Sequence, residues 1–273
     1  MKYLLIGGLL AISSLASAQR LEKIHETDTV FAIPESVLPI PDRNEMYVSL
    51  IDGSAWAADG KGSIGILDRD GKNYRSHWVT GLHAPKGMGL LNNKLYVADI
   101  TSVVVIDTQK AAVTKVIEID SAQNLNDVTV DKNGNVFVSD SRTGKIWKLT
   151  NDKPTLFLEN MKGVNGLKAV GDELYIASGK SFVKADAQGA LSKIAELPMG
   201  GDGVEPVGNG DFIVTAWAGY IFYVHANGKV DTLLETHQDK VNTADIGFDP
   251  VNRIIYVPTF NAKKIILYKL VMP

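Results

Sequence analysis

The chain has no cysteine among its 273 residues. This absence excludes a disulfide framework, a thiolate nucleophile and a zinc site with thiolate ligands. An excess of one charge sign is also lacking, because 28 Lys and Arg stand against 31 Asp and Glu, for a formal net charge of -3. The composition therefore gives no sign of a nucleic-acid surface. We expect a monomer whose partners are small molecules.

Long apolar runs are scarce beyond the N-terminus. A short basic start precedes the apolar residues 3–15, and residues 16–18 form a small-x-small pattern ahead of Gln19. This order is typical of a secretory signal peptide, and the stretch is short for a spanning helix. The sequence therefore predicts a signal peptide over residues 1–18 and a mature domain over residues 19–273. We expect export, with the bacterial periplasm as the compartment and no integral membrane segment after cleavage.

A repeated pattern runs along the rest of the chain at intervals of about 40 residues. In each repeat a short apolar run leads into strand, turn and strand; in the third, Asn133-Gly134 and Thr143-Gly144 separate alternating segments. Such pairs supply the positive φ that hairpin turns need. All-β content with this period predicts a six-bladed β-propeller. The residues that open the repeats are Glu35, Lys86, Asn126, Asn165, Asp202 and Ala244.

The two ends of the chain predict how the ring closes. The last repeat stops after its third strand, residues 264–271, whereas a spare alternating strand, residues 21–27, precedes the first repeat. We predict that the N-terminal strand completes the C-terminal blade and leaves no open sheet edge. The opening residues then surround one mouth, together with loops that carry Trp56 and Trp217. These tryptophans are predicted to wall a pocket, with ordinary packing between blades as the alternative.

Four of the opening motifs resemble those of a known family. They are Pro34-Glu35-Ser36-Val37, Leu125-Asn126-Asp127-Val128, Val164-Asn165-Gly166-Leu167 and Gly201-Asp202-Gly203-Val204. In this order they resemble the first-strand motifs of the gluconolactonase, senescence-marker-protein and luciferin-regenerating-enzyme-like family, over essentially the whole mature chain. The resemblance implies a six-bladed propeller that holds a divalent cation, usually calcium, at the mouth of its channel. Characterised members hydrolyse lactones, and related propellers hydrolyse organophosphate esters.

The resemblance also implies a ligand set. Glu35, Asn165 and Asp202 would be metal ligands, and Asn126 either a fourth ligand or a contact to substrate. The chemistry of these side chains agrees, because calcium takes six to eight oxygen ligands, and two carboxylates with two amide carbonyls supply part of that shell. The ring offers no thiolate or imidazole, so zinc and copper are not expected.

These residues lead to a hypothesis about function. The cation would polarise the carbonyl of a cyclic ester, Asp202 would take a proton from the attacking water, and Glu35 would mainly hold the metal. We therefore expect a secreted, calcium-dependent lactonase or related esterase. The alternative is a non-catalytic propeller with NHL-like repeats that binds carbohydrate or peptide. A third possibility is a sensor or scaffold with a structural metal.

Lys86 departs from this pattern, because it brings an ammonium group to the same mouth. It could bind an anionic substrate or a developing oxyanion, pair with Glu35 or Asp202 in the place of the metal, or extend into solvent. Asn124 stands where some lactonase relatives carry a substrate-contacting arginine, and it is a candidate substrate contact.

Two further polar residues near the mouth have predicted roles. For Asp245 the alternatives are a supporting carboxylate behind the proposed metal ligands and, as the favoured reading, hydrogen bonds to backbone amides at the start of the sixth inner strand. For His83 the alternatives are a proton shuttle and an exposed loop residue.

Overall fold

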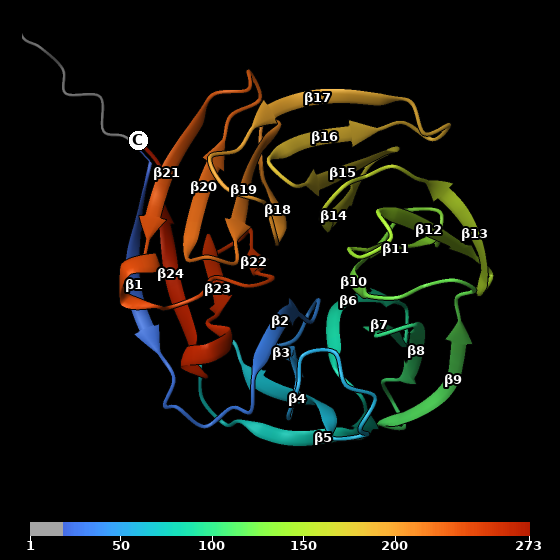
Figure 1. Cartoon of the computed structure of the whole chain (residues 1–273). Coiled ribbons are helices and arrows are strands. Elements are labelled where there is room, and N and C mark those ends of the chain that lie inside the picture. The colour runs from blue at the N-terminus through green and yellow to red at the C-terminus, as the bar shows by residue number, and fades with distance from the viewer. Residues whose placement is uncertain (1–18) are drawn as a thin grey trace, which may run out of the picture.

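The computed structural model describes residues 19–273, which form six four-stranded antiparallel sheets arranged as blades around a central channel (Figure 1). The predicted all-β six-bladed propeller is confirmed. The predicted signal peptide, residues 1–18, lies outside the described residues. In the described part of the chain, no helix is long and apolar enough to cross a membrane.

Each blade contributes one inner strand to the channel and three strands further out. The first three blades, from the channel outward, are β2 (Pro34–Pro39), β3 (Glu45–Leu50), β4 (Gly62–Asp68) and β5 (Arg75–Leu82); β6 (Pro85–Leu91), β7 (Lys94–Asp99), β8 (Ser102–Asp107) and β9 (Ala112–Glu118); and β10 (Leu125–Val130), β11 (Val136–Asp140), β12 (Lys145–Thr150) and β13 (Lys153–Leu158).

The next two blades follow the same plan. They comprise β14 (Val164–Val170), β15 (Glu173–Ser178), β16 (Ser181–Ala185) and β17 (Leu191–Glu196); and β18 (Val204–Gly208), β19 (Asp211–Ala216), β20 (Tyr220–Val224) and β21 (Val230–Glu235). Two short 3-10 helices, η1 (His237–Asp239) and η2 (Phe260–Ala262), lie in the loops of the C-terminal part.

The sixth blade closes the ring. It is built from β22 (Gly247–Asp249), β23 (Ile254–Pro258), β24 (Ile265–Val271) and the N-terminal β1 (Arg20–Glu26), which pairs antiparallel with β24. Figure 1 shows the blue β1 beside the red β24. The predicted closure by the N-terminal strand is therefore confirmed, and both ends of the chain are tied into one sheet.

Apolar clusters between neighbouring blades hold the ring together. Tyr47 and Ile64 of the first blade, for example, pack with Met88 and Leu95 of the second, and all four are buried. A fully buried aliphatic or aromatic side chain contributes about 1.5–3 kcal/mol. Burial between blades therefore stabilises the ring without covalent cross-links.

Candidate functional site

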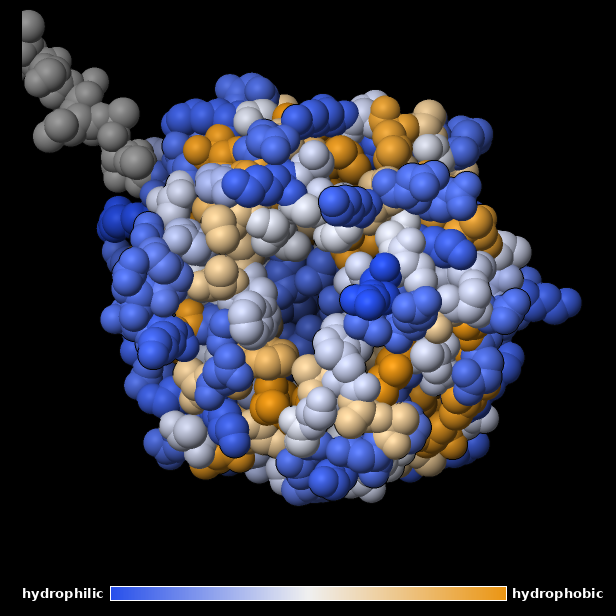
Figure 2. Space-filling model, viewed as in Figure 1, coloured by the Kyte–Doolittle hydropathy of each residue, from blue (hydrophilic) through white to orange (hydrophobic). Residues whose placement is uncertain are grey.

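The opening residues of the inner strands meet at one mouth of the channel. Glu35, Lys86, Asn126 and Asp202 are buried there, and Asn165 is half-buried. The charges of Asp202 and Lys86 both act on Glu35, and the side chain of Asn165 lies close enough to Asp202 to lower its pKa. Figure 2 shows a hollow at the centre of the ring, with hydrophilic residues in its depth.

In the repeats opened by Asn165 and Asp202, the opening residue is followed by glycine, because a larger residue would not fit there. A Cβ atom on Gly166 would lie 1.7 Å from the carbonyl oxygen of Asp202, and one on Gly203 would lie 2.6 Å from the backbone nitrogen of Ile246. Neighbouring inner strands therefore approach backbone to backbone just below the mouth, and only glycine fits there. This close approach brings Asn165 and Asp202, from adjacent blades, within hydrogen-bonding reach.

Among the residues that the structure describes, two oxygen atoms at the mouth have no hydrogen-bond partner. They are Oε2 of Glu35 and Oδ1 of Asn165, and both are buried. Because an unsatisfied buried acceptor costs about 1–3 kcal/mol, such atoms in a native protein call for a water molecule or an ion. A hydrogen bond from Asn126 Nδ2 to Ser141 Oγ, at 3.0 Å, fixes the orientation of the Asn126 side chain.

Burial dominates the electrostatics of the two carboxyl groups. It raises the pKa of Glu35 well above its usual value, with Lys86 opposing and Asp202 adding to the shift. Burial also raises the pKa of Asp202 to about 8, and the charge of Asp245 adds to this shift while Lys86 and Asn165 oppose it. Without a cation, burial therefore favours the protonated form of both carboxyl groups.

Lys86 lies at the mouth and not in solvent. Its side chain is only 2% exposed, and its Nζ lies 4.0 Å from the centroid of the Trp56 ring. The alternative in which Lys86 extends into solvent is therefore wrong. Within residues 19–273, no ion pair or hydrogen bond joins this ammonium group to Glu35 or Asp202, so Lys86 leaves their oxygens free.

Aromatic residues flank the mouth in two places. Trp56 and Trp217 are 40% and 44% exposed, which excludes full packing between blades. Trp217 meets Phe260 edge to face, with ring centroids 5.5 Å apart. Sequence reasoning missed Asn242, whose Nδ2 donates to the backbone oxygen of Trp217 at 2.9 Å and so fixes this loop. No repeat position marks Asn242, because it precedes β22 in an irregular segment.

His83 and Asn124 also lie where inner strands begin. His83 Nδ1 accepts a hydrogen bond from the backbone nitrogen of Gly60 at 3.1 Å, so this half-buried side chain holds the loop that carries Trp56. The alternative in which His83 is an exposed loop residue is therefore wrong, and its role as a proton shuttle stays a prediction. Asn124 is half-buried, and its backbone nitrogen donates to Asp140 at 3.2 Å.

A second layer of carboxyl groups lies below the mouth. Asp245 accepts a hydrogen bond from the Ser36 hydroxyl at 2.5 Å, so the prediction that Asp245 binds backbone amides is wrong. Asp127 has that role, since it accepts from the backbone nitrogens of Val128 at 2.6 Å and Leu167 at 2.5 Å. The buried hydroxyl of Ser36 faces Asp245 directly across the joint between the first and last blades, which explains the difference.

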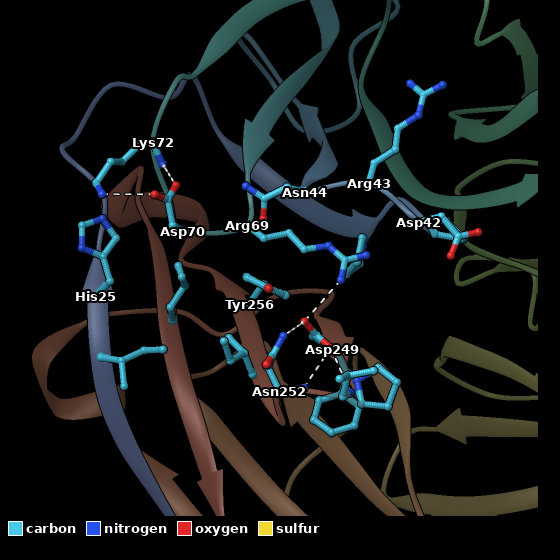
Figure 3. Close-up of a pocket in the computed structure, with 18 residues that line it drawn as sticks. His25, Asp42, Arg43, Asn44, Arg69, Asp70, Lys72, Asp249, Asn252 and Tyr256 are labelled. Carbon is cyan, nitrogen blue, oxygen red and sulfur yellow. Dashed lines mark hydrogen bonds and ion pairs between the residues drawn. The ribbon is translucent and has the colours of Figure 1, made fainter.

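The opposite face carries a groove of about 940 Å³ between the first and last blades. Figure 3 shows Arg69 reaching Asp249 and Lys72 beside Asp70 in this groove. Arg69 Nη1 lies 3.2 Å from Asp249 Oδ2, and Lys72 Nζ lies 3.1 Å from Asp70 Oδ2. These four charged groups are therefore paired with one another.

The donor set at the mouth is limited for a metal ion. Within residues 19–273, no three carboxylate or imidazole groups come together closely enough to form a metal site by themselves. A cation would therefore depend on amide oxygens as well as carboxylates. The unpartnered oxygens of Glu35 and Asn165 fit that requirement, because hard cations such as calcium prefer these two kinds of oxygen.

No protein-family model and no curated protein matches this sequence. Solved structures do share the fold. A catalytically inactive virginiamycin B lyase from Staphylococcus aureus with quinupristin is 14% identical, with a TM-score of 0.67 over 93% of this chain and 100% of that chain. A luciferin-regenerating enzyme is 14% identical, with a TM-score of 0.67 over 93% and 95%. An auxiliary nutrient binding protein from Bacteroides thetaiotaomicron is 11% identical, with a TM-score of 0.65 over 88% and 69%.

Identities this low show the fold alone. The chain is a six-bladed propeller of an architecture that both enzymes and binding proteins use. A shared propeller does not by itself indicate a shared activity, so the function has to be argued from the mouth of this channel.

Proposed function

We propose that the mouth is the active site of a calcium-dependent hydrolase that acts on carboxylic esters, with lactones as its first substrate class. The observation that carries the proposal is the pair of buried, unpartnered oxygens on Glu35 and Asn165 beside the carboxyl group of Asp202. The four opening motifs that resemble the lactonase family support the same activity.

Glu35, Asn165 and Asp202 would hold the cation, and Asn126 would serve as a fourth ligand or a substrate contact. This set offers two carboxylates and two amide oxygens, and calcium fills the remainder of its shell with water and substrate. When bound, the cation supplies a positive charge that polarises the substrate carbonyl and favours ionised carboxylates around it.

Asp202 is the proposed general base. As a carboxylate it takes a proton from water while the water oxygen bonds to the carbonyl carbon. The bond between that carbon and the ester oxygen then breaks, and the proton of Asp202 passes to the leaving alkoxide, which gives an acid and an alcohol.

The test is a screen of the mature chain against aldonolactones, aliphatic lactones and phosphotriesters, each with calcium and with a chelator. We expect lactone hydrolysis that needs calcium, and a Glu35→Gln variant that requires a higher calcium concentration. Hydrolysis at the same rate in chelator, or none of any substrate at saturating calcium, would contradict the proposal.

A second candidate is a binding propeller that holds carbohydrate or peptide without turnover. The exposed rings of Trp56 and Trp217 favour it, because flat aromatic faces at a mouth are suited to stacking against a ligand, and a nutrient binding protein shares the fold. Saturable binding of oligosaccharides, with no hydrolysis in the same screen, would distinguish it.

A further inference from the structure

The ammonium group of Lys86 is buried, and no carboxylate of residues 19–273 forms an ion pair with it. Lys86 is 2% exposed, and its nearest described partner is the face of the Trp56 ring, 4.0 Å from Nζ to the centroid. A cation over an aromatic face is attracted by the electrons of the ring. That contact orients the ammonium group, but it does not neutralise the charge.

Another lysine of the same channel shows the contrast. Lys168 lies on β14, deeper in the channel, and its Nζ lies 2.8 Å from the carboxylate of Glu205. The charge of Lys168 is therefore balanced within the chain. Lys86, at the start of β6, has no such ion pair among residues 19–273.

The charges of three carboxyl groups act on Lys86, those of Glu35, Asp202 and Asp99, but among residues 19–273 none of them forms an ion pair with its Nζ. Asp99 accepts hydrogen bonds from the backbone nitrogens of His83 at 2.9 Å and Ala84 at 2.7 Å. In the proposed function, Glu35 and Asp202 hold a cation. None of the three therefore provides a dedicated counter-ion for Lys86.

Hydrogen bonds hold the loop that carries Trp56 next to the strand that carries Lys86. The loop that carries Trp56 joins β3 to β4, and its Gly60 nitrogen donates to His83 Nδ1 at 3.1 Å. His83 is in turn fixed by Asp99 at the start of the blade that carries Lys86. The segment from His83 to Lys86 thus holds the Trp56 loop next to the lysine at the mouth.

We infer that Lys86, oriented by Trp56, binds an anionic group of the ligand, so that the channel takes esters or lactones that carry a carboxylate or a phosphate. This inference rests on the proposed function for the reaction, but the anion site itself does not need turnover. An incoming carboxylate or phosphate would supply the counter-ion that Lys86 lacks, and would place the substrate carbonyl beside Asp202.

The first test measures binding without turnover. The calcium-free protein is titrated with succinate and with inorganic phosphate, and the affinity is measured by calorimetry for the wild type and for Lys86→Met. Lys162→Met is the matched control, because Lys162 is an exposed lysine in the loop before β14 on the same face. We expect at least about tenfold weaker binding in Lys86→Met and no change in the control.

Comparison of the two ligands identifies the anion: tighter binding of succinate indicates a carboxylate, and tighter binding of phosphate indicates a phosphate. Absence of binding by the wild type, or equal affinity in Lys86→Met, would overturn the inference. If Lys86→Met does not fold, as judged by its circular dichroism, Trp56→Leu takes its place, and it should weaken binding in the same direction.

The second test uses a pair of lactones that differ only in charge, γ-butyrolactone and the same ring with a carboxylate beside the ring oxygen. We expect the ratio of kcat/KM for the charged lactone over the neutral one to fall at least about tenfold in Lys86→Met. An unchanged ratio would overturn the inference. If neither lactone is hydrolysed while the titration shows Lys86-dependent binding, the proposed function fails but the anion site stands.

Discussion

The two faces of the propeller differ in how they treat charge. In the groove on the opposite face, Arg69 pairs with Asp249 and Lys72 pairs with Asp70. At the mouth, within residues 19–273, Lys86 lies over the Trp56 ring without an ion pair, and an oxygen of Glu35 has no hydrogen-bond partner. Paired charges support the fold by themselves, whereas unpaired buried charges cost free energy that the fold does not recover. The difference between the two faces therefore lies in ion pairing: the charges of Arg69 and Lys72 are paired, whereas Lys86 has no ion pair among residues 19–273.

Asp202→Asn, at the mouth, should have the largest effect, and that effect should be on activity. An amide keeps the shape of the side chain but cannot accept the proton of the attacking water. We expect kcat for lactone hydrolysis to fall at least about 100-fold, because general-base catalysis contributes about 10²–10⁴. Steady-state kinetics and the thermal unfolding midpoint check this expectation. Full turnover in a folded Asp202→Asn protein would show that the base is another group.

Asp249→Asn, in the groove, should lower stability and leave activity unchanged. Asp249 accepts hydrogen bonds from the backbone nitrogen of Val251 at 2.9 Å and from Asn252, in addition to its pair with Arg69. Loss of its charge should lower the free energy of unfolding by about 1–3 kcal/mol, with kcat unchanged in the folded fraction. Urea unfolding measures the first quantity and kinetics at low temperature the second. A fall in kcat as large as that of Asp202→Asn would mean that the two faces are not independent.

The fold could be predicted from the sequence because the evidence for it is local and repeated. Each blade shows its alternating strands and its turns, and the missing fourth strand of the last blade matches the spare N-terminal one. The ring then brings the opening residues together by topology alone. Glu35, Asn165 and Asp202 consequently meet at one mouth without any of them being a neighbour in sequence.

The side-chain contacts of the site could not be predicted in the same way. A repeat position gives the place of Lys86 in its blade, but not whether its four-carbon stem turns to solvent, to a carboxylate or to Trp56. The hydrogen bond between Ser36 and Asp245 joins residues from the first and last blades, and only the closed ring brings them together. Such contacts depend on packing between distant segments, which no local pattern records.

The two faces should also differ in how their stability depends on pH. As pH rises, the contribution of Asp202 to the free energy of unfolding should fall, whereas that of Asp249 should rise. In calcium-free protein, burial raises the pKa of Asp202 to about 8, whereas the ordinary value in an unfolded chain is 3.8. The folded state then binds more protons than the unfolded state between about pH 4 and pH 8, so this group lowers the free energy of unfolding as pH rises through that window.

In the groove, burial alone would raise the pKa of Asp249, but hydrogen bonds from Asn252 and Val251 and the charge of Arg69 lower it. The contribution of Asp249 is therefore present above about pH 4 and is lost on acidification.

Urea unfolding in chelator at pH 4.5 and pH 8.5 tests this difference in sign. Because Asn cannot ionise, Asp202→Asn should unfold with a free energy higher than the wild type by on the order of 1 kcal/mol at pH 8.5, and the gain should shrink at pH 4.5. Asp249→Asn should be less stable than the wild type at both values, with a smaller deficit only below pH 4. Equal effects of Asp202→Asn at the two pH values would show that its carboxyl group is ionised in the folded protein, and that the mouth balances its charge without a cation.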